Sequence, residues 1–149
     1  MERSHYFIGL DLGQSQDFTA MVILERWEAA GEWDAAAYAR RKMAAFRLRY
    51  LERIPLGTPY PEVVARVGQM TRSGELRGGC NLMVDATGVG RPVVDLLRRA
   101  GLECPIYAAI ITGADAETNA NGYYRVPKRD LIVGLQVLLQ RGECRLRQG

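Results

Sequence analysis

The stretch that decides the fold is Tyr6-Phe7-Ile8-Gly9-Leu10-Asp11-Leu12-Gly13. Its length and its apolar residues are typical of a buried central β-strand. Alternate side chains of a strand point to opposite faces, so Asp11 shares a face with Phe7 and Gly9. A carboxylate in such a strand is costly unless it is paired or binds a cation. The stretch therefore predicts a central strand that delivers one functional carboxylate at its end.

A second stretch repeats this design, with Leu82-Met83-Val84-Asp85 followed by Ala86-Thr87-Gly88-Val89-Gly90. Both apolar runs end in aspartate, and glycine follows in each case. In α/β sheets, ligands bind at the edge of the sheet where such strands end. We therefore expect Asp11 and Asp85 to meet at that edge.

The remaining periodicity predicts one α/β domain over residues 1–149. Strands are expected at residues 6–12, 18–27, 44–53, 81–85 and 104–111, and a short one at 144–147. Helices are expected at residues 60–73, 92–101 and 127–142, a turn at 31–34 and a surface loop at 112–122. The last helix is expected to turn its apolar side chains inward: Leu131, Ile132, Leu135, Leu138 and Leu139. The predicted fold is a mixed β-sheet with an antiparallel first three strands and helices on both faces.

Composition places the chain among ordinary globular proteins, with 48% hydrophobic and 25% charged residues. No apolar run approaches the roughly 20 residues of a membrane span, so no membrane partner is expected. No signal-peptide pattern follows the N-terminus. Cys80, Cys104 and Cys144 are odd in number and far apart, which favours free thiols in a reducing cytosol.

The net charge is only +3, but arginine is concentrated in two clusters, at residues 40–53 and 125–147. Arginine suits phosphate because its planar fork donates two hydrogen bonds at once. The alternative interpretation is a solvated basic face without a ligand. The candidate DNA-binding cations in these clusters are Arg47, Arg49, Lys128 and Arg129.

Paired carboxylates at one sheet edge predict a divalent cation site. Mg²⁺ and Mn²⁺ prefer hard oxygen ligands and use few protein carboxylates. Two such ions about 4 Å apart can activate a water and stabilise the leaving oxygen in phosphodiester cleavage. The alternative is that Asp11 and Asp85 only cap turns. Asp17 and Asp130 are candidate further ligands, although turn capping is the favoured explanation for Asp17 and a favourable helix dipole is the favoured one for Asp130.

The glycine turn after the second stretch leads directly into a helix that Pro92 opens. Backbone N–H groups at a helix N-terminus bind phosphate. The spacing matches neither the dinucleotide G-x-G-x-x-G pattern nor a P-loop. Gly88, Gly90 and Arg91 are therefore candidates for a contact with a nucleic-acid phosphate, and a tight strand–helix turn is the alternative.

These residues resemble the ribonuclease H-like nuclease domain of phage terminase large subunits. The matching stretches are residues 8–20, residues 84–90, and Pro127-Lys128-Arg129-Asp130-Leu131. The resemblance implies a metal-dependent endonuclease that cuts double-stranded DNA in the bacterial host cytoplasm, together with other phage packaging proteins. Asp11 and Asp85 would match two of the family's metal ligands, with Mg²⁺ or Mn²⁺ as cofactor.

The sequence departs from this family at its end, because no acid follows Glu143 where the family has a third ligand on a further helix. The chain is then either a piece lacking that helix or an isolated relative. A catalytically silent DNA-binding or assembly module is one alternative function. An actin-like or sugar-kinase-like nucleotide-binding half is another, because Asp11-Leu12-Gly13 and Asp85-Ala86-Thr87-Gly88 resemble phosphate loops of that superfamily.

Overall fold

The structure, a computed structural model, describes residues 4–13 and 16–146. The chain begins with three strands and continues with alternating helices and strands. In order, the elements are β1 (His5–Asp11), β2 (Thr19–Asp34), β3 (Ala39–Ile54), α1 (Tyr60–Thr71), β4 (Cys80–Asp85), α2 (Arg91–Arg99), β5 (Ile106–Thr112), β6 (Thr118–Ala120), β7 (Tyr123–Pro127), α3 (Lys128–Gln140) and β8 (Cys144–Arg145).

The described strands form one mixed sheet in the order β6-β7-β5-β4-β1-β2-β3-β8. β1 lies near the middle, antiparallel to β2 and parallel to β4. β2 and β3 are antiparallel, whereas β5, β7 and β8 pair in parallel with β4, β5 and β3. The predicted α/β class and the antiparallel first three strands are thus confirmed.

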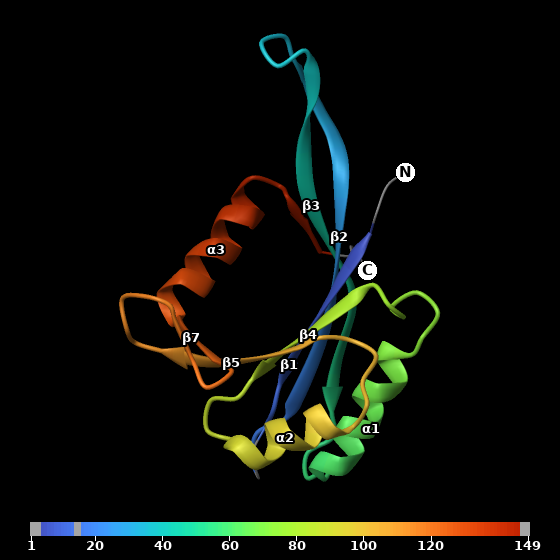
Figure 1. The fold of residues 1–149 in the computed structure, drawn as a ribbon, viewed down its shortest axis with the longest axis vertical. Helices are drawn as coiled ribbons and strands as arrows, with labels where there is room; N and C mark the ends of the chain where they lie inside the picture. The colour runs from blue at the N-terminus through green and yellow to red at the C-terminus, as the bar shows by residue number, and fades with distance from the viewer. Residues whose placement is uncertain (1–3, 14–15, 147–149) are drawn as a thin grey trace.

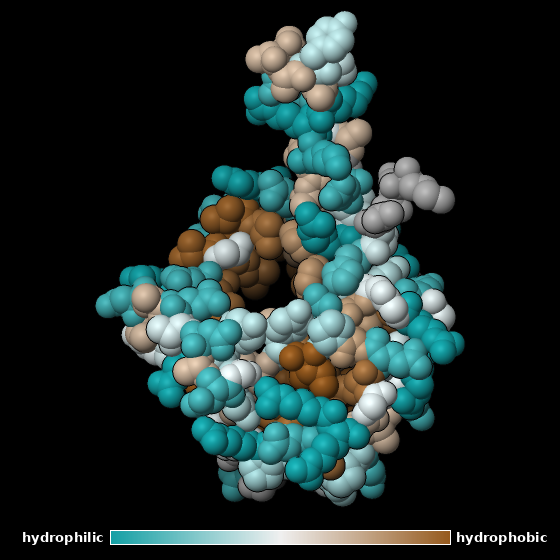
Figure 2. Space-filling view, viewed as in Figure 1, coloured by the Kyte–Doolittle hydropathy of each residue, from teal (hydrophilic) through white to brown (hydrophobic). Residues whose placement is uncertain are grey.

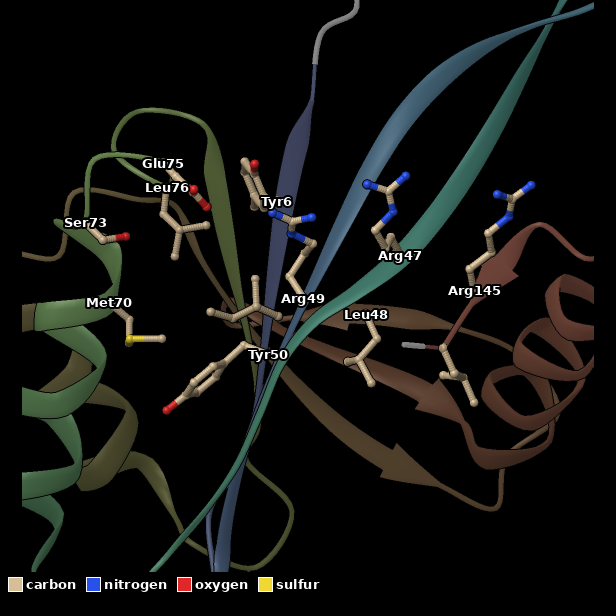
Figure 3. Close-up of a pocket in the computed structure, with 12 residues that line it drawn as sticks. Tyr6, Arg47, Leu48, Arg49, Tyr50, Met70, Ser73, Glu75, Leu76 and Arg145 are labelled. Atoms are coloured by element: carbon tan, nitrogen blue, oxygen red, sulfur yellow. The ribbon is translucent and has the colours of Figure 1, made fainter. Parts of the chain in front are cut away.

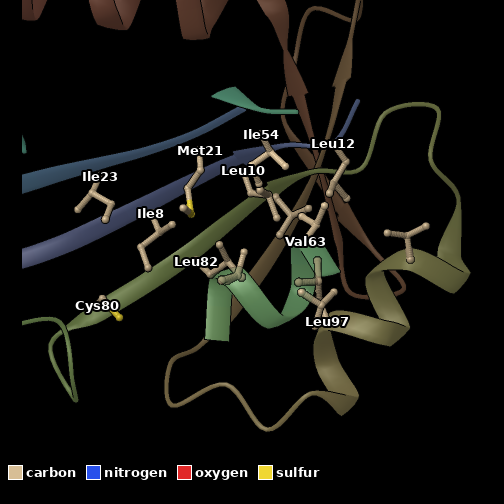
Figure 4. Close-up of a cluster of buried hydrophobic side chains, with 14 of the residues drawn as sticks. Ile8, Leu10, Leu12, Met21, Ile23, Ile54, Val63, Cys80, Leu82 and Leu97 are labelled. Atoms are coloured by element: carbon tan, nitrogen blue, oxygen red, sulfur yellow. The ribbon is translucent and has the colours of Figure 1, made fainter. Parts of the chain in front are cut away.

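The core lies between the sheet and two helices, α1 and α2 (Figure 4). Ile8, Leu10 and Leu12 are buried in β1, as the period of two predicts. Against them pack residues from α1, α2 and β4, among them Val63, Val67, Leu82, Val93 and Leu97. Asp11 therefore belongs to the opposite face of the sheet. Figure 1 places α3 on that opposite side, away from α1 and α2.

β2 and β3 form a long two-stranded arm that projects beyond β1 (Figure 1). The turn predicted at residues 31–34 is wrong, because these residues belong to β2 and the turn lies at residues 35–38. Asp34 Oδ1 accepts hydrogen bonds from the backbone N–H groups of Ala36 at 3.0 Å and Ala37 at 3.3 Å. Such a side-chain-closed turn needs neither glycine nor proline.

The loop predicted at residues 112–122 is also wrong in part, because it contains β6. β6 pairs with β7 in an antiparallel hairpin that extends the sheet beyond β5. Asn121 and Gly122 form the hairpin turn with φ of 55° and 76°. Asn-Gly is a strong hairpin signal because both residues tolerate positive φ.

The inward apolar face predicted for α3 is wrong. No residue of α3 is buried, and Leu131, Ile132 and Leu135 are about half exposed. α3 begins directly after β7 and ends just before β8. It therefore connects strands that lie toward opposite edges of the sheet. Figure 2 shows its apolar side chains gathered beside a hollow in the surface.

The thiols match the sequence prediction, since Cys80, Cys104 and Cys144 are free and buried or half-buried. Burial raises the pKa of Cys104 to about 11, which makes it a poor nucleophile at neutral pH. None of the helices in the described part of the chain has the length and apolar character needed to span a bilayer.

Candidate functional site

Asp11 and Asp85 are register neighbours at the carboxyl ends of β1 and β4. The two strands are parallel, so paired residues point to the same face. On β4 that face also carries Met83, which is 40% exposed, whereas Val84 on the other face is fully buried. The structure therefore brings the two predicted carboxylates together on the face that α1 and α2 leave open.

Small residues flank the two carboxylates across the sheet. Asp85 pairs with Ala109 of β5, and Asp11 pairs with Ala20 of β2. Ala20 pairs in turn with Arg53 of β3. The strand spacing of about 4.8 Å places the Arg53 Cα about 10 Å from that of Asp11. The paired residues across the sheet are thus two neighbouring aspartates, which we call the acidic centre, with one alanine on each side. Arg53 follows Ala20 at one end of this row.

The charges of the site act on Asp11. Partial burial raises the pKa of its carboxyl group, and the negative charges of Asp85 and Asp17 raise it further. Because Asp11 is exposed, water offsets much of the effect of burial on its pKa. The repulsion between neighbouring carboxylates is therefore the cause that bears on what the site can bind. A cation between these carboxylates would remove that repulsion.

The turn after β1 brings Asp17 back toward the acidic pair. Gly13 N–H donates to Thr19 Oγ1 at 3.0 Å, and the Tyr60 hydroxyl donates to the Gly13 carbonyl at 3.1 Å. A Cβ on Gly13 would collide with the backbone carbonyl of Asp17, so only glycine fits here. The closure of this turn explains why Asp17 acts on Asp11.

Asp85 is fixed by the turn that follows β4. Its Oδ1 accepts a hydrogen bond from Thr87 N–H at 2.9 Å, and Thr87 Oγ1 accepts one from Ile111 N–H at 2.9 Å. Asp85 Oδ2 has no hydrogen-bond partner among the described residues. Oδ1 of Asp85 therefore caps the turn, as the alternative interpretation predicts, and Oδ2 can still bind a ligand.

Five of the predicted DNA-binding residues lie at this same carboxyl edge. Gly88, Gly90 and Arg91 join β4 to α2, and Lys128 and Arg129 open α3 directly after β7. Parallel strands end at one edge of a sheet, which is why segments so distant in sequence gather here.

Asp130 is not brought into the acidic centre. It lies beside Arg129, whose Nη1 is 3.8 Å from Asp115 and whose Nε is 3.7 Å from Asp130. The charges that act on Asp11 are those of Asp85 and Asp17. Of the two candidate further ligands, only Asp17 is thus near the pair.

Arg47 and Arg49 lie at the other end of the sheet. Arg47 and Tyr6 both pair with Glu25, so they lie near the amino end of β1, about 17 Å along the strand from Asp11. There Arg47 and Arg49 line a cavity of about 570 Å³ on the α1 side, together with Arg145 (Figure 3). The structure does not bring these two predicted DNA-binding residues to the carboxylates.

Arg53 belongs to the first of the two arginine clusters, but it was not among the predicted DNA-binding residues. It lies in the row of the two carboxylates, and its guanidinium carbon is 4.8 Å from the Phe18 ring centroid. Its place depends on the register of three strands, which a local pattern does not contain.

The donor set of the site is limited. Among residues 4–13 and 16–146, no group of three or more His, Cys, Asp or Glu side chains is arranged to hold a metal ion. Comparisons with protein-family models, curated proteins and solved structures give no match to this chain.

Proposed function

We propose that this chain is a ribonuclease H-like, metal-dependent endonuclease that hydrolyses phosphodiester bonds of double-stranded DNA. The observation that supports this most is the register pairing of Asp11 with Asp85 on the open face of the sheet. Two rigid strand ends hold these carboxylates side by side, and alanines flank them. Short side chains beside the carboxylates leave room for a DNA backbone to approach them.

The residues present fit Mg²⁺ or Mn²⁺. Carboxylate oxygens are the hard ligands that these ions prefer. Partial burial raises the pKa of Asp11, and so does the repulsion from neighbouring carboxylates, which a cation would relieve. Asp11 and Asp85 would hold the ion, and Asp17 adds negative charge near Asp11 without completing a group of three ligands among the described residues. When bound, such an ion supplies Lewis-acid stabilisation of phosphoryl oxygens and lowers the pKa of a water molecule.

The other residues of the edge would position the DNA. Arg53 lies on one side of the carboxylates, and Lys128 and Arg129 lie on the other, beyond β5. Their charges would neutralise backbone phosphates and make binding depend on salt. The Thr87 N–H fixes one oxygen of Asp85 and so orients the other.

Plasmid cleavage with Mn²⁺ or Mg²⁺ tests the proposal. Asp11→Asn and Asp85→Asn are expected to abolish cleavage while preserving side-chain shape. Glu103→Gln is the matched control, because it removes an exposed acid whose only ion pair among the described residues is with Arg77, at 2.9 Å. Cleavage that is unchanged in both aspartate variants would reject the proposal.

A catalytically silent DNA-binding module is the second candidate, because the described residues lack a three-ligand metal group. It predicts that the wild type binds duplex DNA with a steep salt dependence and never cuts it. In either case Arg53→Gln should lower the log–log salt slope by about 1, the value expected for one lost phosphate contact. Arg49→Gln is the matched control in the distant cavity and should leave the slope unchanged if DNA crosses the open face. If Arg49→Gln lowers the salt slope more than Arg53→Gln does, the DNA binds on the other face of the sheet.

A further inference from the structure

A second, smaller cavity lies where the β4–α2 connection meets the β6–β7 hairpin. Its volume is about 140 Å³. One water molecule needs about 10–15 Å³ of such space, so the cavity has ample room for one tetrahedral oxyanion. The walls combine small apolar residues with polar donors, and no carboxylate lines them: Ala86, Gly90, Arg91, Ile110, Ala120, Asn121, Tyr123 and Arg125.

The N-terminus of α2 opens at this cavity. Gly90 caps the helix with φ of 74°, no side chain caps it, and no acid lies in its first turn. The first N–H groups of a helix have no partner within the helix, so those of Arg91 and Val93 are available to an anion. Pro92 between them has no N–H group.

Two arginine residues line the cavity, and no described residue pairs with their side chains. The side chains of Arg91 and Arg125 make no hydrogen bond, ion pair or ring contact with any described residue. Arg125 pairs in register with Ile110, which places it on the α2 side of the sheet. Two unpaired positive side chains beside one small cavity repel each other, and an anion between them would relieve that repulsion.

Tyr123 provides an independent indication of a ligand. The residue is only 8% exposed, it lines the cavity, and its hydroxyl is buried without a hydrogen-bond partner. Arg98 limits the movement of the ring, with its guanidinium carbon 5.4 Å from the ring centroid while it donates to the Gly122 carbonyl at 3.1 Å. A buried hydroxyl is costly when unpaired, and an oxyanion oxygen would accept its hydrogen bond.

We propose that this cavity binds one phosphate group through Arg91, Arg125, the Tyr123 hydroxyl and the first amides of α2. Identifying that group as a backbone phosphate of the DNA substrate rests on the proposed nuclease function. Ala86 of the cavity directly follows Asp85, so a strand that passes over the carboxyl edge would reach both places. The cavity would then hold a phosphate beside the one that is cut.

The test is a titration with inorganic phosphate at constant ionic strength, followed by ¹H–¹⁵N NMR. The amide signals of Gly90, Arg91 and Val93 are expected to shift and saturate. Arg91→Gln combined with Arg125→Gln should weaken phosphate binding by about a hundredfold, because each of the two lost charge-assisted hydrogen bonds contributes about tenfold. Arg145→Gln removes the same charge from the other cavity and should leave the affinity unchanged.

A flat titration of the wild type, or equal binding by the double variant, overturns the proposal. Tyr123→Phe keeps the ring and is expected to fold. It should weaken phosphate binding severalfold. Unchanged binding would show that the hydroxyl does not contact the phosphate. Saturable phosphate binding by a protein that never cuts DNA supports the cavity and counts against the nuclease. Cleavage with unchanged KM in the double variant, together with a flat titration, leaves the nuclease and overturns the cavity.

Discussion

Replacing Asp11 by asparagine should stabilise the protein at neutral pH in the absence of divalent cations. The substitution removes a charge that the structure places beside Asp85 and near Asp17. Paired residues on neighbouring strands lie about 5 Å apart. Two unit charges at that distance repel by about 0.8 kcal/mol in bulk water and by about 3 kcal/mol at an effective dielectric constant of 20.

The lower end of this range applies because Asp11 is exposed. We therefore expect a gain of about 1 kcal/mol, which corresponds to about 2–4 °C in Tm for a domain of this size. Divalent cations should reverse the order of the two proteins. Mn²⁺ at a hundred times its Kd would stabilise the wild type by about 2.7 kcal/mol, and it should stabilise the variant much less.

The pH dependence has a definite sign. The pKa of Asp11 is raised in the folded protein above its ordinary value of 3.8, so the folded state binds the proton more tightly than the unfolded state. The penalty is present above the raised pKa and disappears as pH falls through it toward 3.8. The advantage of Asp11→Asn should therefore be full at pH 7 and vanish near pH 4.

Differential scanning calorimetry between pH 7 and pH 4, with and without Mn²⁺, measures all three effects. The reasoning is refuted if Asp11→Asn lowers Tm by the same amount at every pH, or if Mn²⁺ raises the Tm of both proteins equally. The assay needs no DNA, so it tests the acidic centre even in a protein that never cuts.

Two further predictions use matched pairs of substitutions. Gly13→Ala should destabilise the protein by about 1–3 kcal/mol and weaken Mn²⁺ binding, because the new methyl group meets the backbone of Asp17; Gly74→Ala, with open space around it, should change stability little in urea unfolding. Leu82→Ala should cost about 2–5 kcal/mol, because Leu82 is fully buried, whereas Leu135→Ala on the exposed surface of α3 should stay within about 0.5 kcal/mol. A comparable loss at Leu135 would mean that α3 is packed in solution.

The sequence predicted the acidic pair because the signal is local. An apolar run with period two fixes which face Asp11 takes, and the parallel pairing of β1 with β4 brings Asp85 beside it. The neighbours of the pair were not predictable in the same way. Ala20 and Arg53 join the row only through the register of the long β2–β3 arm, which pairing over long distances decides.

The turn predicted at residues 31–34 is wrong because Gly31 has a different role in the structure. Gly31 lies within β2, where a Cβ would approach the Arg41 carbonyl oxygen to 2.8 Å. The pairing of β2 with β3 also shifts in register between Ala30 and Trp33. Glycine there serves a close backbone approach at a bulge, and the same residue in sequence looks like a turn.

The helix pattern of α3 was recognised, but the surface it covers was not. Spacing of apolar residues predicts a helix with one apolar side, and it contains no information on what lies opposite that side. α3 follows β7 and precedes β8 at the far side of the sheet, so its path is set by topology. Its exposed leucines are the result of that path.

The placement of donors at the carboxyl edge is consistent with the polymer ligand that the proposed function implies. A nucleotide-binding half would need phosphate contacts from the turns after both β1 and β4. Gly13 N–H in the first turn already donates to Thr19 Oγ1, so it is not available to a phosphate. The second turn leads into α2 with its first amides uncapped, on the side of the sheet opposite the two carboxylates. Phosphate donors and carboxylates thus lie on two sides of one edge, and a chain of phosphates that crosses the edge can contact both.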